Sequence, residues 1–489
     1  MSTTSVPTPT SRCLAGLART EITPPVGIYH RMWGAAKHDR AAGVHRPLFA
    51  TVLILEPLTA SDAERHYLVA LDHCLLRPED MDRFHEDVAG LLAIESDQLT
   101  VIFSHTHSGG LIVRSRADLP GGELIGPYLD ELPHRVAEAA KEALNSRRQV
   151  VMTYATTFSD MARNRDYRDV ENGLHVCGFN PDAENADGPG YPLHVVRMTN
   201  AETNEPVGVI VNYPCHPTTL AWDNALISPD YIGALRETVE NAVGAPCLFV
   251  LAPCGDVGPR HGFVGDVEVA DRNGRQVAYA ALSALESMPA PCHEQHYAGP
   301  VISGATIGAW EFRPLSIERH LASRAFLRRS WSIPLDYHQN LPSLQDAEKE
   351  LRVRESAEQS ARDRGAEVEA GRLRAMVERQ RRLIERIRPL PPGRYPYRVK
   401  LLKIGDAIWI ELEGEPYFYL QGELQRRFPQ TLFIFAVLSN GSRPSYLPRR
   451  EDYDKPLYQV EVSLLAAGSL ERIVDEISSQ LERLPATSA

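Results

Sequence analysis

The chain has 489 residues, a formal net charge of −12 and a hydrophobic content of 43%, which is ordinary for a globular protein. The acidic balance argues against nucleic acid or an anionic membrane surface as the main partner, since both attract basic faces. No apolar run approaches the roughly 20 residues that span a bilayer, so a stable membrane anchor is not expected.

The cysteines and the first residues bear on the compartment. Seven cysteines are scattered from Cys13 to Cys292 without a C-x-x-C pair, which is more typical of reduced thiols than of a disulfide framework. Residues 1–13 are rich in Ser, Thr and Pro and lack the apolar segment of a secretory signal. We therefore predict a disordered stretch over 1–13 and a cytoplasmic protein.

Apolar runs of strand length alternate with helical patterns along the chain. After a short strand within 16–27, the predicted strands cover 48–55, 67–71, 99–103, 193–198, 207–213, 247–252, 397–404, 407–411 and 431–438. The predicted helices cover 78–93, 128–144, 228–243, 418–428 and 469–484. Strands that alternate with helices indicate an α/β protein, in which sites lie beyond the ends of strands.

One segment differs from the rest in composition. From 342 to 388 the chain is dominated by Glu, Arg, Gln and Ala, with a minority of apolar residues. We predict one or two exposed helices here, with a break near Gly365 or Gly371. A solvated surface suits such a segment, and so does a lid or a contact between copies in a homo-oligomer.

The stretch of greatest chemical interest follows the predicted strand 99–103 and reads Ser-His-Thr-His-Ser-Gly over 104–109. In an extended chain, residues two apart point to the same face, so His105 and His107 would face one pocket. Neutral imidazole is a common metal ligand and the usual acid/base group near pH 7. The alternative is a strand end with two solvated histidines.

Several other predicted strands also end in loops that contain potential ligands. These loops carry His216, Asp256, the cluster over 411–415, and Tyr446. Two nitrogens with one or two oxygens suit Zn²⁺, which polarises a carbonyl and brings the pKa of a bound water to about 7. Each residue also has a structural alternative, because His216 could serve a turn, Glu415 could cap a helix and Tyr446 could pack.

These motifs together resemble the neutral/alkaline ceramidase superfamily, specifically its zinc-containing N-terminal hydrolase domain. The matching pieces occur in the family's order over roughly 14–470 and are Gly16–Gly27, Leu71-Asp72, Ser104–Gly109, Asn164-Arg165, His216–Thr218, Gly255–Val257, Gly414-Glu415, Tyr446, Tyr453 and Tyr458. The resemblance implies mixed β-sheets flanked by helices in a single domain over 14–489. The charged helices of 342–388 would be an insertion in it.

The resemblance also implies roles for individual residues. Zinc would be bound by His105, His216, Glu415 and Tyr446. His107 would be the acid/base beside the metal water, and Arg165 and Tyr458 would contact the substrate or the tetrahedral intermediate. Asp256, Gly258 and Tyr453 would lie at the substrate. The family hydrolyses the amide of N-acyl sphingosines, so the resemblance implies an amidase.

Three departures from the family shape this expectation. A serine with a catalytic role is usual in the loop over 256–259, but the residue here is Gly258, so we expect direct attack by zinc-bound water. A C-terminal immunoglobulin-like domain and a secretory signal are also not expected. We therefore expect a small-molecule or lipid-like amide substrate, which need not be ceramide. An esterase or lactonase with the same zinc site, or a non-catalytic ligand-binding protein, are the alternatives.

Overall fold

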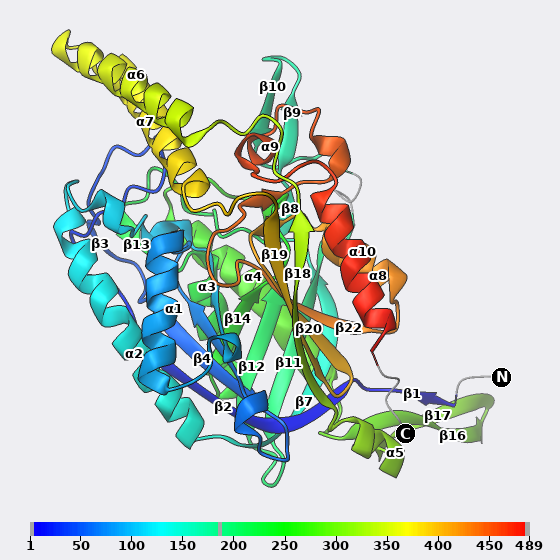
Figure 1. Ribbon diagram of the computed structural model, residues 1–489. Helices are drawn as coiled ribbons and strands as arrows, with labels where there is room; N and C mark the ends of the chain where they lie inside the picture. The colour runs from blue at the N-terminus through cyan, green and yellow to red at the C-terminus, as the bar shows by residue number, and fades with distance from the viewer. Residues whose placement is uncertain (1–3, 184–187, 485–489) are drawn as a thin grey trace.

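The computed structural model describes residues 4–183 and 188–484. Its centre is an eight-stranded mixed sheet (Figure 1). In spatial order the strands are β14 (Cys247–Leu251), β12 (Pro206–Tyr213), β11 (Tyr191–Asn200), β7 (Arg148–Ser159), β2 (Thr10–Glu21), β4 (Phe49–Glu56), β5 (His66–Leu71) and β6 (Leu99–Phe103). Only the outer pairs β14–β12 and β5–β6 are parallel.

This main sheet is covered on both faces. Helices pack on one face, and they are α1 (Pro78–Leu92), α2 (Ile125–Asn145), α3 (Tyr231–Val243) and α4 (Val267–Ser287). A second, four-stranded sheet covers the other face, in the order β18 (Phe326–Leu335), β19 (Tyr395–Ile404), β20 (Ala407–Leu412) and β22 (Leu432–Ala436). Burial on both faces explains why strands such as β5 and β6 are continuous apolar runs.

The two sheets enclose an apolar core of their own. It includes Leu53 and Ile210 from the main sheet and Leu402, Trp409 and Ile434 from the second sheet. On the outer side of the second sheet lie α8 (Tyr419–Arg427) and α10 (Ser469–Glu482) (Figure 1). The fold is therefore a four-layer arrangement of helices, sheet, sheet and helices, which confirms the predicted α/β class.

The main sheet coils so strongly that its two edges approach each other. β14 and β6 are the outermost strands, yet β14 contacts both β5 and β6. Adjacent strands rotate by roughly 20–25°, so the seven strand pairs together accumulate about 140–175°. β6 and β14 are antiparallel by the order of pairing along the sheet, and this accumulated rotation makes them point in the same direction. This brings the carboxyl ends of β6, β12 and β14 together at one end of the molecule.

A buried amide fixes the second sheet against this edge. Asn212 is fully buried on β12. Its Nδ2 donates to the carbonyl oxygens of Val250 (2.8 Å) and Phe435 (2.7 Å), and its Oδ1 accepts from the Phe435 N–H (3.1 Å). These bonds hold β22 beside β12 and β14. The loop that follows β22 is thereby placed next to the loop that follows β12.

The prediction of disorder over 1–13 is wrong for the described residues 4–13. β1 (Ser5–Val6) pairs with β16 (His293–Ser303), and β2 begins at Thr10 and pairs with β7. Cys13 is buried between the sheets, and the Tyr154 hydroxyl donates to Ser11 Oγ at 2.9 Å. The small polar side chains thus find buried partners across the chain, which the local composition does not reveal.

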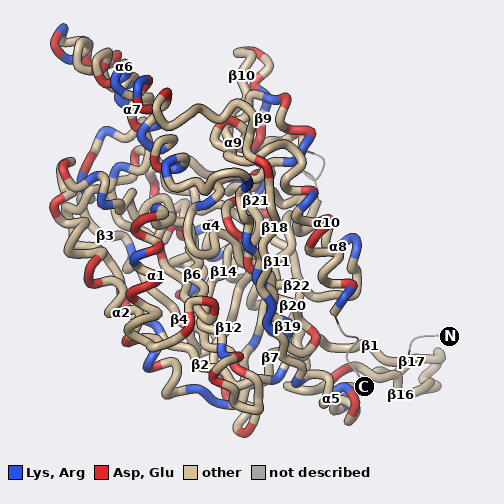
Figure 2. Tube along the Cα trace, viewed as in Figure 1, with Lys and Arg blue, Asp and Glu red and all other residues tan. Residues whose placement is uncertain are grey.

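The charged segment forms a helical hairpin, which we call the arm. It consists of α6 (Leu344–Asp363) and α7 (Glu367–Ile387), with the break at Gly365. The tip of the arm projects away from the rest of the domain, and Lys, Arg, Asp and Glu alternate along the arm (Figure 2). The root of α7 returns to the domain. The prediction of helices over 342–388 is confirmed.

Shorter elements complete the fold. They are β3 (Gly43–Val44) with β13 (Leu226–Ile227), β8 (Ala162–Asn164) with β15 (Val257–Pro259), β9 (Asp166–Asp169) with β10 (Leu174–Cys177), β21 (Glu415–Pro416) with β23 (Tyr446–Leu447), β17 (Ala305–Pro314), α5 (Ile317–Ala322) and α9 (Tyr458–Val462). None of the helices over the described ranges is long and apolar enough to cross a membrane.

Candidate active site

Three buried side chains converge where the strand ends meet. His105 follows β6, His216 follows β12, and Glu415 begins β21. Glu415 Oε2 lies 2.9 Å from His216 Nε2 and 3.3 Å from His105 Nε2. One ligand atom from each of the three residues lies within 4.8 Å of the others. This is the geometry expected of groups that can share one metal ion.

Backbone carbonyls orient both imidazoles. His105 Nδ1 lies 2.6 Å from the carbonyl oxygen of Cys74, and His216 Nδ1 lies 2.7 Å from that of Cys254. If each Nδ1 donates its proton to that carbonyl oxygen, each Nε2 keeps a lone pair on the side of Glu415, where a metal ion could be bound. A hydrogen bond from the distal nitrogen is the usual support of a metal-ligating histidine. His105 Nε2 is buried and has no hydrogen-bond partner.

A phenol and a guanidinium stand beside these groups. The Tyr446 hydroxyl lies 3.2 Å from His216 Nε2. Arg165 Nη2 donates to the Tyr446 hydroxyl (3.1 Å) and to the carbonyl oxygen of Gly255 (2.7 Å). Burial raises the pKa of Tyr446, while Arg165 acts to lower it. Arg165 thereby holds the phenol oxygen toward the centre.

Burial and neighbouring charges set the protonation of the centre. Burial lowers the pKa of His216 to about 3, so its imidazole is neutral near pH 7 and can donate a lone pair to a metal ion. Burial opposes the charge of Glu415, but His105 and His216 hold the pKa of this carboxyl well below its usual range. A carboxylate with neutral imidazole is the combination that divalent zinc favours.

His107 lies beside the three side chains without joining them. Its ring centroid is 5.0 Å from that of His105 and 6.2 Å from that of His216. Its Nε2 is buried and has no hydrogen-bond partner. His107 is less buried than His105, so the opening of the site lies on its side.

The two histidines share a pocket for a different reason from the one the strand pattern gives. β6 ends at Phe103, and His105 has a left-handed backbone with φ of 68°. Thr106 then caps a short 3₁₀ turn that begins at His107, with its Oγ1 accepting from the Ser108 N–H at 3.2 Å. Such backbone strain in a non-glycine residue is typical of functional sites.

The structure separates the other predicted site residues. Tyr458 is 44% exposed and packs edge-on against Tyr446, with ring centroids 6.0 Å apart. Asp256 Oδ1 accepts from the Phe418 N–H at 2.7 Å. Tyr453 donates to the carbonyl oxygen of Leu465 at 2.9 Å, so its hydroxyl serves local structure. Of these, Tyr458 is the one whose ring lies against a candidate ligand, Tyr446.

Gly258 lies on β15, beside Arg165. A Cβ built at this position would lie 3.4 Å from Arg165 Cδ and 3.8 Å from Thr218 Oγ1. Thr218 Oγ1 is itself buried without a hydrogen-bond partner. The position is therefore close to the site and has room for a small side chain.

Two features of the site were missed in the sequence. Cys74 forms a second candidate group with His105 and His107, although His105 Nδ1 is already bonded to the Cys74 carbonyl oxygen.

The second feature is an aromatic wall, which consists of Trp33, Trp222 and Phe263. Trp33 lies 5.1 Å from His107 between ring centroids, and the wall residues lie 5.7–6.4 Å from one another. No sequence motif joins its members.

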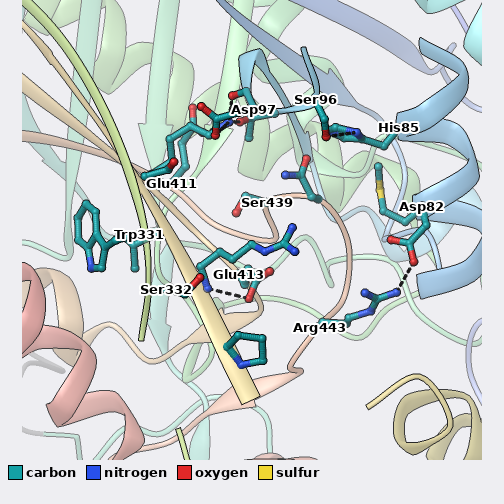
Figure 3. A pocket seen from close by; sticks show the side chains of 18 of the residues that line it. Asp82, His85, Ser96, Asp97, Trp331, Ser332, Glu411, Glu413, Ser439 and Arg443 are labelled. Carbon is teal, nitrogen blue, oxygen red and sulfur yellow. Dashed lines mark hydrogen bonds and ion pairs between the residues drawn. The ribbon is translucent and has the colours of Figure 1, made fainter. Parts of the chain in front are cut away.

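A separate cavity of about 840 Å³ lies between α1 and the second sheet (Figure 3). Asp82 and Arg443 form an ion pair across it at 2.7 Å, and Glu413 accepts from the Arg398 N–H at 3.1 Å. Burial raises the pKa of Glu413 to about 7. The four predicted zinc ligands do not line this cavity, and the described residues place no candidate metal group in it.

The fold is similar to that of ceramidases of known structure. The neutral ceramidase from Pseudomonas aeruginosa matches with a TM-score of 0.66 and 16% identity, over 98% of this chain and 76% of that chain. A ceramidase complexed with C2 matches with a TM-score of 0.65 and 15% identity, over 99% and 77%. No protein-family model and no curated protein matches the sequence. The likeness confirms the ceramidase-like fold that the motifs predict.

Proposed function

We propose that this chain, which has the fold of the neutral ceramidases, is a zinc-dependent hydrolase that cleaves an amide (N-acyl) bond. The observation that carries the proposal is the convergence of His105 Nε2, His216 Nε2 and Glu415 Oε2, with the Tyr446 hydroxyl alongside. This donor set fits zinc. When bound, zinc supplies Lewis acidity, which polarises a carbonyl and lowers the pKa of a water.

The side chains around the donors divide the remaining work. His107 has a free buried Nε2, so it takes the proton of the attacking water and returns it to the leaving nitrogen. Arg165 lies next to Tyr446 and supplies positive charge where the carbonyl oxygen becomes anionic. Gly258 offers no nucleophile, so water attacks the carbonyl directly. Tyr458 contacts the substrate at the opening.

Replacing His107 with alanine tests this division of roles. Loss of a general acid/base lowers kcat roughly 10²- to 10⁴-fold, whereas the donors at His105, His216 and Glu415 remain. We expect the H107A protein to keep its zinc, measured by elemental analysis, and to lose amidase activity. Glu415→Gln is the matched comparison, in which zinc affinity should fall as well. Full activity in the H107A protein would contradict the proposal.

The bond that is cleaved needs a separate test, since the same chemistry attacks esters. A panel of amides, esters and lactones with the same acyl group would be hydrolysed in parallel. We expect turnover of the amides to depend on His107. Turnover of esters or lactones alone would favour an esterase or lactonase with this site.

The compartment is also part of the proposal. The cysteines are free, and five of the seven are buried. Reduced thiols of this kind are the rule in the cytoplasm, which supports a cytoplasmic enzyme. If protein recovered from the periplasm or the medium without reductant kept all of its thiols, free cysteines would not indicate the cytoplasm. That result would argue against this location.

A further inference from the structure

The root of the arm brings two arginines to the site. In α7, Glu378, Arg382 and Arg386 are spaced by four residues and therefore share one face of the helix. Figure 1 shows α7 running from the projecting tip of the arm back to the domain. Its C-terminal turns thus join the charged insertion to the catalytic domain.

Glu378 and Arg382 are occupied by structural contacts. Arg382 Nε lies 2.9 Å from Glu378 Oε1, and Arg382 Nη2 donates to the carbonyl oxygen of Met32 at 2.6 Å. Met32 precedes Trp33 of the aromatic wall. Arg382 therefore fixes α7 against the wall, and its charge is already paired with Glu378 rather than available to a ligand.

Arg386 differs from Arg382 in having no acidic partner among the described residues. Its one hydrogen bond runs from Nε to the carbonyl oxygen of Arg382 at 3.2 Å. The neighbouring carboxylate, Glu385, is bound to Arg116 at 2.5 Å and to Arg77 at 3.3 Å. Arg386 is partly buried, and a partly buried guanidinium without a counter-ion is unusual, since buried charges are normally paired.

The surroundings of Arg386 belong to the site. Tyr458, Glu415 and Tyr446 all interact with it electrostatically. Tyr458 is 44% exposed, so Arg386 lies close to a solvent-exposed part of the site. Beside His107, the aromatic wall offers a surface for an apolar group. The site therefore presents both an apolar surface and a cation near the candidate centre.

We propose that the substrate is an N-acyl amino acid, whose carboxylate binds Arg386 while its acyl group packs against the aromatic wall. The inference rests on the proposed amidase function and names its substrate class. A guanidinium without an ion pair matches the single charge of a carboxylate, and guanidinium–carboxylate pairs are strong and can be bidentate. The leaving group would then be an amino acid.

The test compares two substrates that differ only in this charge. N-lauroylglycine carries the carboxylate, and N-lauroylglycinamide replaces it with a neutral amide. We expect wild-type kcat/KM to favour N-lauroylglycine at least tenfold. Arg386→Gln should lower kcat/KM for N-lauroylglycine roughly ten- to a hundredfold, from the loss of a charge-assisted hydrogen bond, and change that for the neutral compound less than twofold.

Two further variants separate charge from folding. Arg386→Lys keeps the cation and should keep most of the preference. Arg372→Gln removes an exposed cation elsewhere on α7 and should change neither substrate. An equal fall for both substrates in R386Q, or a wild-type preference for the neutral compound, would overturn the inference while leaving an amidase intact.

Binding provides a readout that does not need turnover. Calorimetry with N-lauroylglycine should give a Kd at least tenfold weaker for R386Q than for wild type, with no such change for the neutral compound. If no amide is hydrolysed, the proposed function fails, but this binding difference would still support a carboxylate site at Arg386. Equal binding of both compounds by both proteins would overturn it.

Discussion

Arg116 holds the arm to the domain, and its replacement by methionine should loosen the arm. Arg116 is only 2% exposed. Its Nη2 lies 2.9 Å from Glu378 and its Nη1 lies 2.5 Å from Glu385, both on α7. Methionine preserves most of the apolar stem and removes the charge, so the two carboxylates lose their shared partner.

The expected magnitude follows from what those carboxylates retain. Removal of one partner from a buried ion pair costs about 3–5 kcal/mol. Glu378 keeps Arg382 at 2.9 Å, and Glu385 keeps Arg77 at 3.3 Å, so neither is left unpaired. We therefore expect a cost of about 2 kcal/mol in the R116M protein.

Hydrogen exchange locates this loss. A local cost of about 2 kcal/mol raises the exchange rate of the α7 amides roughly 30-fold, while amides in β4 and β12 should exchange as in wild type. Arg352→Met, at an exposed position of α6, is the matched control. Unchanged exchange in α7, or equal acceleration across the main sheet, would refute the view that Arg116 anchors the arm.

Two further predictions concern Gly258 and Glu413. Gly258→Ser should change the free energy of unfolding by less than about 1 kcal/mol, because the new Cβ would make only ordinary contacts. It should also leave kcat within a few-fold of wild type. A tenfold rise in kcat would instead show that a hydroxyl at this position acts in the reaction. Burial raises the pKa of Glu413 to about 7, above its ordinary value near 4.5, so the folded chain retains a proton that the unfolded chain loses, and wild-type stability falls as pH rises through that window. Glu413→Gln keeps the acceptor for the Tyr395 hydroxyl and the Arg398 N–H, so urea unfolding should find it about 1–2 kcal/mol more stable than wild type at pH 8 and equal at pH 4.5; the same pH slope in both proteins would contradict this.

The local parts of the fold could be predicted from the sequence. The strand 99–103 coincides with β6, because five consecutive buried residues form a pattern that needs no tertiary information. The helix predicted over 228–243 begins later, at Tyr231, because the Asp230 side chain caps it by accepting from the Tyr231 N–H. α4 was not predicted at all. Gly274 lies in its middle and allows close contact with α3, because a Cβ at this position would lie only 2.1 Å from the carbonyl oxygen of Tyr231.

The assembly of the site could be predicted only in part. The motifs name residues on loops after several strands, but the loops meet because the main sheet coils until β14 contacts β6, a property of the whole sheet. Arg386 lacks a carboxylate partner in the described parts of the chain because Arg77 and Arg116 both bind the neighbouring Glu385. Long-range contacts of this kind leave no local pattern in the sequence.

The most direct test of the central claim is a zinc titration of metal-free protein, followed by amide hydrolysis at each step. If His105, His216, Glu415 and Tyr446 hold one catalytic zinc, amidase activity should rise in proportion to added zinc and stop rising at one zinc per chain. Amide hydrolysis at full rate in protein shown to be free of metal would contradict the account. So would a zinc-loaded, folded protein that hydrolyses no amide.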